Sequence, residues 1–427
     1  MSRVLVRGGR LIDPANGLDG RFDLLLEGGV VCRVADRIEA TGAEVVSAEG
    51  KLVLPGLVDI HCHLREPGYE YKEDIASGAQ AAARGGFTSI CCMANTSPVN
   101  DNAGVTTFIR QRAEEAGAGV RVYPIAAVTK GLEGLELTDF AALKAAGAVA
   151  LSDDGRPVAD ALTMRRALEQ ADAVGLPLLS HCEDLSLLDG GVMNEGAVSA
   201  RAGLPGASRA AEEVMIARDL LIAEALDVRV HICHVSTRGG VQLIREAKAR
   251  GVRVTAETAP HYLAATDSWV ERRGTLTRVN PPLRTEDDRL ACIYGLADGA
   301  LDCIATDHAP HHASEKAVDY PSAASGISGF ETAFAICWTH LVEHGYMGPE
   351  QLVWLMACAP ARMLGLKAGS LGVGDAADLV IADPHERWTV DASAFASKGK
   401  NTPFSGETYT GRVHDTFVAG RRIVNAL

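Results

Sequence analysis

The sequence lacks long apolar runs and is short of positive charge. None of its 427 residues lies in a run of the 18 or more apolar residues that a membrane-spanning helix needs. The opening residues, MSRVLVRGGRLIDP, favour a strand and a turn over a signal peptide. With 41 Lys and Arg against 55 Asp and Glu, the net charge is -14. Nucleic acids and anionic membranes call for a basic surface, so we expect neither as a partner and place the protein in the cytoplasm.

The sequence also lacks any C-x-x-C pair, although it has ten cysteines. Most of them lie in apolar, strand-like runs such as SICCM and LDCIA. A small buried thiol is the favoured interpretation of each, and metal binding by Cys182 or Cys233 is the less favoured one.

From residue 54 onward, short apolar runs alternate with segments of helical periodicity. Several of the helical segments end in glycine, as helices often do. Eight strands with helices between them predict an α/β protein with a (β/α)8 barrel, and a doubly wound open sheet is the alternative. The predicted strands cover residues 56–60, 87–93, 120–127, 148–152, 176–181, 228–234, 252–257 and 301–306.

The two ends of the chain have a different pattern. Residues 1–53 and 366–427 are short, alternating and rich in turns, which is typical of β-strands. Each end is too short to build a large core by itself. We therefore predict that the two ends pack together into one small β-domain beside a catalytic barrel of residues 54–365.

The stretch DIHCHLREPG, residues 59–68, places polar side chains at every second position. Alternation along an extended strand would turn Asp59, His61, His63 and Arg65 to one face. A strand packed only for stability would have apolar residues on its buried face. The pattern therefore indicates a functional site, with a partly exposed edge strand as the alternative.

Further histidines and aspartates follow other predicted strands. Because active sites of such barrels lie at the carboxyl ends of the strands, these side chains are expected to converge. Imidazole nitrogen and carboxylate oxygen are ligands that zinc accepts. Four histidines and two aspartates exceed one tetrahedral ion, so two metals bridged by a carboxylate and a hydroxide are expected. The candidate residues are His61, His63, Asp153, Asp154, His181, His231, His234, Asp307, His308, His311 and His312.

These motifs resemble those of the amidohydrolase superfamily, and more narrowly the class I dihydroorotases. The resemblance extends from GGRLIDP near the start to GDAADLVIADP near the end. It implies two zinc ions per subunit, one bound by His61, His63 and Asp307 and the other by His181 and His234. It also places the bridging carboxylate within SDDG, residues 152–155.

The bridge has two candidates. Many relatives, including hydantoinases, use a carboxylated lysine, but no lysine lies between Lys144 and Lys248. Class I dihydroorotases have an aspartate there. An extended strand would not point both Asp153 and Asp154 at the metals. The spacing to His181 favours Asp154, with Asp153 in reserve.

Substrate recognition requires residues beyond the metal ligands. The guanidinium of Arg65 can bind a carboxylate through two hydrogen bonds, and dihydroorotate has a ring carboxylate whereas hydantoin and allantoin have none. Without the resemblance, Asn95 and Asn280 are explained equally well as turn residues that hydrogen-bond to their own backbone. The substrate-binding residues that the resemblance implies are His63, Arg65, Asn95, Asn280, His311, Ser325 and Gly326.

The predicted reaction is the reversible cyclisation of N-carbamoyl-L-aspartate to L-dihydroorotate in pyrimidine biosynthesis. A zinc-bound hydroxide would attack the ring carbonyl while Asp307 carries the proton. The polar segment 308–326 is expected to close over the substrate. Two alternatives stay open, a hydantoinase or allantoinase and a non-catalytic scaffold for aspartate transcarbamoylase. A homo-oligomer is expected, with aspartate transcarbamoylase as a possible partner.

Overall fold

Eight parallel strands occupy the centre of the larger part of the molecule. The computed structural model describes residues 3–117 and 119–425. The central strands are β6 (Leu57–Cys62), β7 (Phe87–Cys92), β8 (Arg121–Ala126), β9 (Ala150–Leu151), β10 (Leu179–Ser180), β13 (Val230–Ile232), β14 (Val254–Thr258) and β15 (Cys303–Ile304). They pair in the orders β6-β7-β8-β9 and β10-β13-β14-β15. Parallel bridges from Leu151 to Leu178 and from Cys62 to His308 join these two sheets at both margins.

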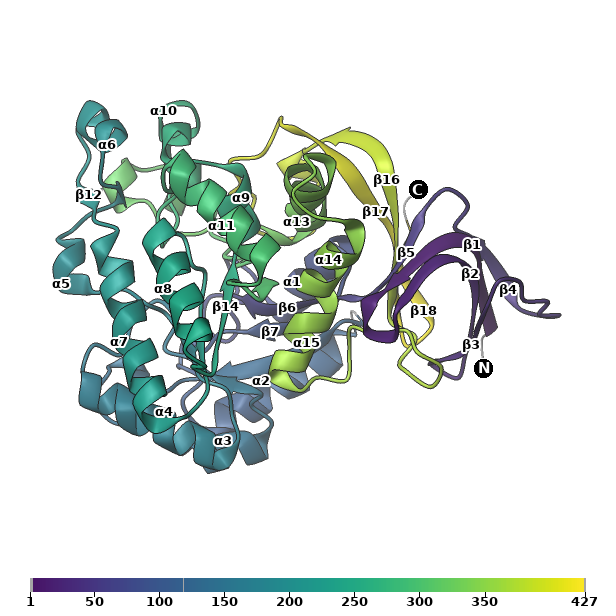
Figure 1. Cartoon of the computed structure of the whole chain (residues 1–427), viewed down its shortest axis with the longest axis horizontal. Coiled ribbons are helices and arrows are strands. Elements are labelled where there is room, and N and C mark those ends of the chain that lie inside the picture. Colours follow the sequence, from purple (N-terminus) through teal and green to yellow (C-terminus); the bar gives the residue numbers. More distant parts are fainter. Residues whose placement is uncertain (1–2, 118, 426–427) are drawn as a thin grey trace.

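Helices connect the central strands and surround them (Figure 1). The longer helices are α1 (Ile75–Arg84), α2 (Ala103–Ala116), α3 (Phe140–Ala146), α4 (Ala161–Val174), α7 (Ala210–Leu226), α8 (Arg238–Ala249), α11 (Glu286–Asp298) and α13 (Phe330–Cys337). Shorter elements are α5 (Leu185–Leu188), β11 (Met193–Asn194), α6 (Ala197–Ala202), β12 (Gly206–Ala207), α9 (Pro260–Ala264), α10 (Val270–Arg273), α12 (Ala313–Lys316), α14 (Pro349–Val353) and α15 (Ala359–Leu364). Strands and helices thus alternate as the sequence predicts, and each predicted central strand overlaps an observed one.

Side-chain caps fix where several of these helices begin and end. The Asp74 carboxylate accepts a hydrogen bond from the backbone N–H of Ser77 at the start of α1. Asp160 accepts one from the backbone N–H of Thr163 at the start of α4. Such bonds satisfy N–H groups that have no partner within the helix. Gly175, with φ +67°, ends α4 in the left-handed conformation that glycine adopts without strain.

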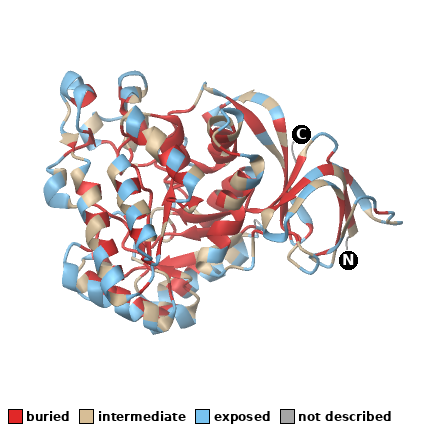
Figure 2. Ribbon diagram, viewed as in Figure 1, coloured by how far each residue is buried: buried red, intermediate tan, exposed pale blue. Residues whose placement is uncertain are grey.

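Most residues of the central strands are buried, except the first half of β8 and one residue of β14, which are half-buried. All residues of β6 and β7 are buried, and Figure 2 shows burial concentrated in the strands and on the inner sides of the helices. Helices covering a parallel sheet explain why these strands are continuous apolar runs rather than alternating ones. A charged side chain buried within them costs stability. Asp59, His61 and Glu257 are therefore candidates for a functional role.

A second sheet, set to one side in Figure 1, draws on both ends of the chain. Its strands are β1 (Arg3–Asp13), β2 (Leu18–Glu27), β3 (Val30–Ala35), β4 (Glu44–Ser47), β5 (Leu52–Pro55), β16 (Leu379–Thr389), β17 (Thr408–Val418) and β18 (Arg421–Asn425). They run in the order β18-β17-β16-β5-β1-β2-β3, with β4 paired to β1. The antiparallel pair β5–β16 joins the two ends, and one apolar cluster includes Leu24, Val53, Ile381 and Phe417.

The ten cysteines are all free thiols, and all but Cys32 are buried. The prediction of small buried thiols in the strand-like runs is therefore confirmed. Within residues 3–117 and 119–425, no helix combines the length and the apolar character needed to cross a membrane.

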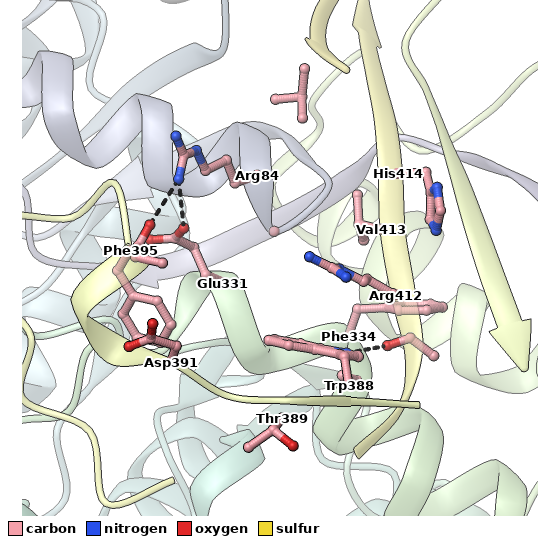
Figure 3. Close-up of a pocket in the computed structure, with 15 residues that line it drawn as sticks. Arg84, Glu331, Phe334, Trp388, Thr389, Asp391, Phe395, Arg412, Val413 and His414 are labelled. Atoms are coloured by element: carbon pink, nitrogen blue, oxygen red, sulfur yellow. Dashed lines mark hydrogen bonds and ion pairs between the residues drawn. The ribbon is translucent and has the colours of Figure 1, made fainter. Parts of the chain in front are cut away.

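A groove of about 320 Å³ lies between the end of α1, helix α13 and strands β16 and β17 (Figure 3). Its charged side chains already have partners. Arg84 donates to the carbonyl of Ala394 and lies 3.8 Å from the Glu331 carboxylate. Arg412 pairs with Glu386 at 2.7 Å. None of the predicted metal ligands lines this groove.

Candidate metal centre

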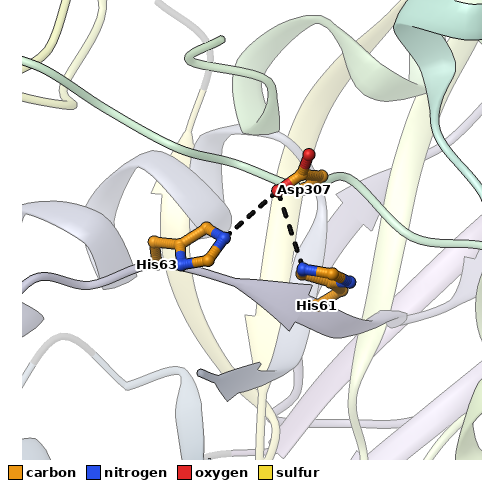
Figure 4. A group of neighbouring side chains, drawn as sticks. All are labelled: His61, His63 and Asp307. Carbon is orange, nitrogen blue, oxygen red and sulfur yellow. Dashed lines mark hydrogen bonds and ion pairs between the residues drawn. The ribbon is translucent and has the colours of Figure 1, made fainter. Parts of the chain in front are cut away.

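Six predicted ligands come together at the ends of five central strands. His61 is the second-last residue of β6 and His63 follows that strand, while Asp154, His181, His234 and Asp307 follow β9, β10, β13 and β15. Asp307 Oδ1 lies 3.2 Å from His63 Nε2 and 3.6 Å from His61 Nε2 (Figure 4). Asp154 Oδ1 lies 3.2 Å from His181 Nδ1 and 3.3 Å from His234 Nε2. All six residues are buried.

The two adjacent aspartates have different surroundings. Asp154 contacts the imidazoles, with Oδ1 3.4 Å from His61 Nε2 and Oδ2 3.5 Å from His63 Nε2. Asp153 instead accepts hydrogen bonds from the backbone N–H groups of Val128 and Thr129 at 2.7 and 3.0 Å, and from the Thr129 hydroxyl. Of these two adjacent aspartates, only Asp154 has its carboxylate within the cluster.

The donor set fits divalent cations. In the described part of the chain, His61 Nε2 and His234 Nδ1 are buried without a hydrogen-bond partner, which is costly unless another group binds them. Two triplets, His61–His63–Asp307 and His61–Asp154–His234, each hold three donor atoms within 4.8 Å of one another. Zinc accepts nitrogen and oxygen donors that lie this close together.

The electrostatics of the cluster also call for positive charge. Burial raises the pKa of Asp154, but the His61 charge and the hydrogen bonds from His181 and His234 outweigh it and hold that pKa well below its usual value. Burial lowers the pKa of His181, yet its hydrogen bonds to Asp154 and Glu183 raise it to about 10. Ionised Asp154 is therefore stable here only beside cations, which protonated imidazoles or bound metal supply.

Three site residues have an uncommon backbone conformation. Arg65, His234 and Asp307 have φ values of +64°, +35° and +46°. Such left-handed conformations are unfavourable for residues other than glycine, and they concentrate at functional sites where the surrounding structure holds them. In each case the chain turns sharply just after a central strand, which directs the side chain into the site.

Two carboxylate or amide groups fix the histidine rings. Glu257 Oε1 lies 2.6 Å from His61 Nδ1, and Asn95 Oδ1 lies 3.0 Å from His63 Nδ1. Each oxygen accepts the Nδ1 proton, so each ring, when neutral, has its lone pair on Nε2, where it can bind a metal. Sequence reasoning missed Glu257, although a glutamate at the end of the apolar run VRVTAE was the signal that could have found it.

Arg65 lies beside the cluster, but strand alternation does not place it there. Strand β6 ends at Cys62, and the left-handed turn at Arg65 directs the side chain instead, so the prediction of one continuous strand face is wrong at this residue. The Arg65 Nε–H donates to the carbonyl of Pro310 at 3.2 Å. Burial lowers the pKa of Arg65, while the charges of Asp307 and Asp154 oppose that change.

His311 lies between Arg65 and Lys72 and is neutral. Its Nδ1 is 3.4 Å from Lys72 Nζ and can only accept, so its Nε2–H donates to the Ser325 carbonyl at 2.8 Å. Burial, together with the charges of Arg65 and Lys72, lowers the pKa of His311 to about 3. The Arg65 Nη2, 3.3 Å from His311 Nε2, therefore retains its protons for another acceptor. Sequence reasoning missed Lys72.

Gly326 is required by close packing against the same histidine. Its φ is +151°, and a Cβ there would lie 2.5 Å from the Ala309 carbonyl oxygen and 3.0 Å from His311 Cδ2. The predicted residues Ser325 and Gly326 thus lie against His311. Segment 308–326, predicted to close over the substrate, includes α12. Its Lys316 ammonium donates to the Thr275 and Arg278 carbonyls.

Asn280 lies at the other side of the cluster, next to His181. Its Nδ2 donates to Glu183 Oε2 at 3.1 Å, and the same oxygen is 3.5 Å from His181 Nε2. Glu183 was not predicted, although it lies only two residues after His181 in SHCED. The structure therefore brings the six expected ligands, Arg65, Asn95 and Asn280 around one cluster, together with Glu183 and Glu257. The candidate His312 is instead exposed and caps α12.

Comparison with known proteins identifies the family. A family model described as dihydro-orotase-like matches residues 50–240. A dihydroorotase from Acetivibrio thermocellus is 51% identical over 421 residues, which cover 99% of each chain. A dihydroorotase from Syntrophus aciditrophicus is 52% identical over 421 residues, or 98% of each chain. This chain belongs to the dihydroorotase family.

Solved structures show that this member of the dihydroorotase family shares its fold with hydantoinases. The L-hydantoinase (dihydropyrimidinase) from Arthrobacter aurescens superposes with a TM-score of 0.90 at 26% identity, over 100% of this chain and 96% of that one. A D-hydantoinase from Thermus sp. gives a TM-score of 0.83 at 25% identity, over 99% and 95%. The resemblance to dihydroorotases is thus confirmed at the level of the family, within an amidohydrolase fold.

Proposed function

We propose that the protein is a class I dihydroorotase, which interconverts N-carbamoyl-L-aspartate and L-dihydroorotate. The observation that carries this proposal is the Arg65 guanidinium beside the histidine–aspartate cluster. Its Nη2 lies 3.3 Å from His311 Nε2, and the guanidinium lies near Asp307 and Asp154. A guanidinium binds carboxylates through paired hydrogen bonds. Dihydroorotate has a carboxylate on its ring, whereas hydantoin and allantoin, the substrates of the alternative enzymes, have none.

The cluster would hold two zinc ions per chain. His61, His63 and Asp307 would bind one ion, His181 and His234 the other, and Asp154 would bridge them. Bound zinc lowers the pKa of a water ligand and polarises a substrate carbonyl. The unpartnered His61 Nε2 and His234 Nδ1 support this assignment.

Asp307 is the proton carrier in this proposal. In the hydrolytic direction its carboxylate accepts a proton from the attacking water and returns that proton to the ring nitrogen as the amide bond breaks. Ring closure uses the same steps in reverse. Its position 3.2 Å from His63 Nε2, within a buried cluster, supports this role, because a general base must lie within hydrogen-bond reach of the reacting atoms.

Substrate orientation falls to the residues around Arg65. Arg65 and Asn95 would bind the ring carboxylate, and His311, Ser325 and Gly326 would contact the substrate at that end of the site. Asn280 would bind the opposite side of the ring, and His63 contributes to both metal and substrate binding. A carboxylate held at Arg65 keeps the reacting amide at a fixed offset from Asp307, which is how positioning lowers a barrier.

The same proposal includes the architecture. The parallel bridges at both margins of the central sheets support a closed (β/α)8 barrel of residues 54–365. The pairing of β5 with β16 supports one small β-domain from residues 1–53 and 366–427. A homo-oligomer and an aspartate transcarbamoylase partner stay predictions of the sequence.

Ring-opening assays on L-dihydroorotate, hydantoin and allantoin test the function. We expect kcat/KM for dihydroorotate to exceed the other two by at least the ~10² that a bidentate charged contact can contribute. Preference for hydantoin or allantoin would assign the protein to the alternative enzymes. A metal-loaded protein without activity on any of the three would favour the non-catalytic scaffold.

A further inference from the structure

The backbone on both sides of Asp307 is held by an unusual set of hydrogen bonds. Asp307 has φ +46°, a conformation that an aspartate keeps only when its neighbours impose it. The residue before it, Thr306, and the residue after it, His308, are both buried. What fixes these two residues therefore decides where the Asp307 carboxylate points.

Asp59 fixes the residue before Asp307. Its Oδ1 accepts the Thr306 backbone N–H at 2.8 Å, and its Oδ2 accepts the Thr306 hydroxyl at 2.6 Å. Asp59 lies on β6 and is fully buried, and Thr306 follows β15, so the pair ties the first central strand to the last. Two hydrogen bonds to one residue leave Thr306 little freedom to rotate.

The Thr306 hydroxyl also reaches across Asp307. While it donates to Asp59, its oxygen accepts the backbone N–H of His308 at 3.0 Å. One hydroxyl thus joins the residues on either side of Asp307 and closes a tight loop around it. This local bond supports the left-handed turn directly.

His308 is fixed on its other sides as well. Its ring Nδ1 accepts the backbone N–H of Gly329 at 3.1 Å, and the ring stacks on Phe330 with centroids 4.1 Å apart. Its carbonyl accepts the backbone N–H of His63 at 2.8 Å. The turn at Asp307 is therefore attached to His63, a proposed metal ligand just after β6, and to the start of α13.

We propose that Asp59 and Thr306 are positioning residues that hold the turn at Asp307 so that its carboxylate faces the reacting atoms. This inference rests on the proposed role of Asp307 as proton carrier. Stability alone does not call for Asp59, because a fully buried carboxylate is costly and an apolar residue would pack a central strand better. Its two oxygens are instead matched to the two donors of Thr306.

The test removes the Thr306 hydroxyl without changing its shape. Thr306→Val deletes the hydroxyl's bonds to Asp59 and His308 and keeps the backbone bond to Asp59, whereas Thr306→Ser retains a hydroxyl. Thr88→Val is the matched control, because Thr88 is a buried threonine at the start of β7 whose hydroxyl has no hydrogen-bond partner. Purified holoenzymes are compared by kcat and KM for dihydroorotate, by elemental analysis of bound metal and by thermal unfolding.

We expect Thr306→Val to lower kcat by about 10- to 100-fold, since a misplacement of about 1 Å can cost 10²-fold. KM should change by less than about threefold, and metal content should stay at the wild-type level. Thr306→Ser should recover most of the rate, and Thr88→Val should match the wild type. Asp59→Asn, which preserves shape and one acceptor, should give an intermediate kcat.

A double-mutant cycle separates positioning from general support of the fold. In an Asp307→Asn background, Thr306→Val should lower the residual rate no further, because no carboxylate is left to position. A wild-type kcat in Thr306→Val, an equal loss in Thr88→Val, a rate loss that tracks metal loss, or an additive cycle would each overturn the inference. A wild-type protein unable to open dihydroorotate would instead contradict the proposed function.

Discussion

Asp153 and Asp154 are adjacent in the chain, yet their carboxylates bind different partners. Asp153 accepts from the backbone of residues 128 and 129, whereas Asp154 lies within 3.5 Å of nitrogen atoms from four histidines. The first carboxylate holds a loop and the second holds charge in the cluster. The sequence leaves open which aspartate bridges the metals, and this difference predicts that variants at the two positions will differ in metal content.

Asp154→Ala should therefore lose most of at least one metal equivalent, and Asp153→Ala should not. The reason is that only Asp154 can lie between the two proposed ions. Elemental analysis of the purified variants measures this directly, with dihydroorotate turnover as a second readout. Metal loss in Asp153→Ala alone would transfer the bridging role to Asp153.

Asp307→Asn should abolish most of the activity. Removal of a general acid or base typically costs about 10² to 10⁴ in rate, and the loss of a charged ligand adds to that. Turnover of dihydroorotate and metal content should be measured on the same sample. An Asp307→Asn protein with turnover near the wild-type rate would rule out Asp307 as the proton carrier.

The loss of kcat/KM in Arg65→Met should depend on the charge of the substrate. A hydrogen bond to a charged group contributes about 1.5–3 kcal/mol, so losing the paired contact should lower kcat/KM for dihydroorotate by on the order of 10² or more. Any weak activity on an uncharged cyclic imide should fall far less, and metal content should not change. Equal losses on both substrates would show that Arg65 supports the fold or the metals instead.

Glu331, which lines the groove in Figure 3, should make stability depend on pH. Burial raises its pKa from 4.5 to about 7, so the folded state keeps its proton where the unfolded state has lost it. Glu331 therefore makes its full contribution to the free energy of unfolding below about pH 4.5, and this contribution is lost as pH rises through about 7. Glu331→Gln, which imitates the protonated form, should gain roughly 1–3 kcal/mol on the wild type between pH 5 and pH 8.

Chemical unfolding of both proteins at the two pH values measures that gain. The same substitution at exposed Glu114 on α2 is the control and should show no such trend. A constant difference between wild type and Glu331→Gln at pH 5 and pH 8 would show that Glu331 is already ionised in the folded protein.

Much of the fold could be predicted from local sequence patterns. Continuous apolar runs such as FTSICCM indicated buried parallel strands, because only helices on both sides allow a strand to be apolar at every position. Glycines marked where several helices end. Strand β7 accordingly lies where the sequence places it, to within one residue.

The candidate ligands could also be predicted, because chemistry restricts them to histidine and aspartate at strand ends. Their supporting residues could not. Glu257 is 196 residues from His61 in the sequence, and Asn280 is 97 residues from Glu183. A contact over such a separation leaves no local pattern, so the sequence offers only a polar residue within an apolar run as a signal.

The sequence by itself determined the residue types of the site, the alternation of strands and helices, and the absence of a lysine to bridge the metals. Tertiary structure decided which aspartate enters the cluster and how Arg65 reaches it. Arg65 reaches the cluster through a backbone turn after the strand, where alternation no longer applies: its φ is +64°, and Asp307 turns in the same way with φ +46°. Hydrogen bonds between distant strands, such as the one between Thr306 and Asp59, accompany such a turn. A pattern of neighbouring residues cannot predict them.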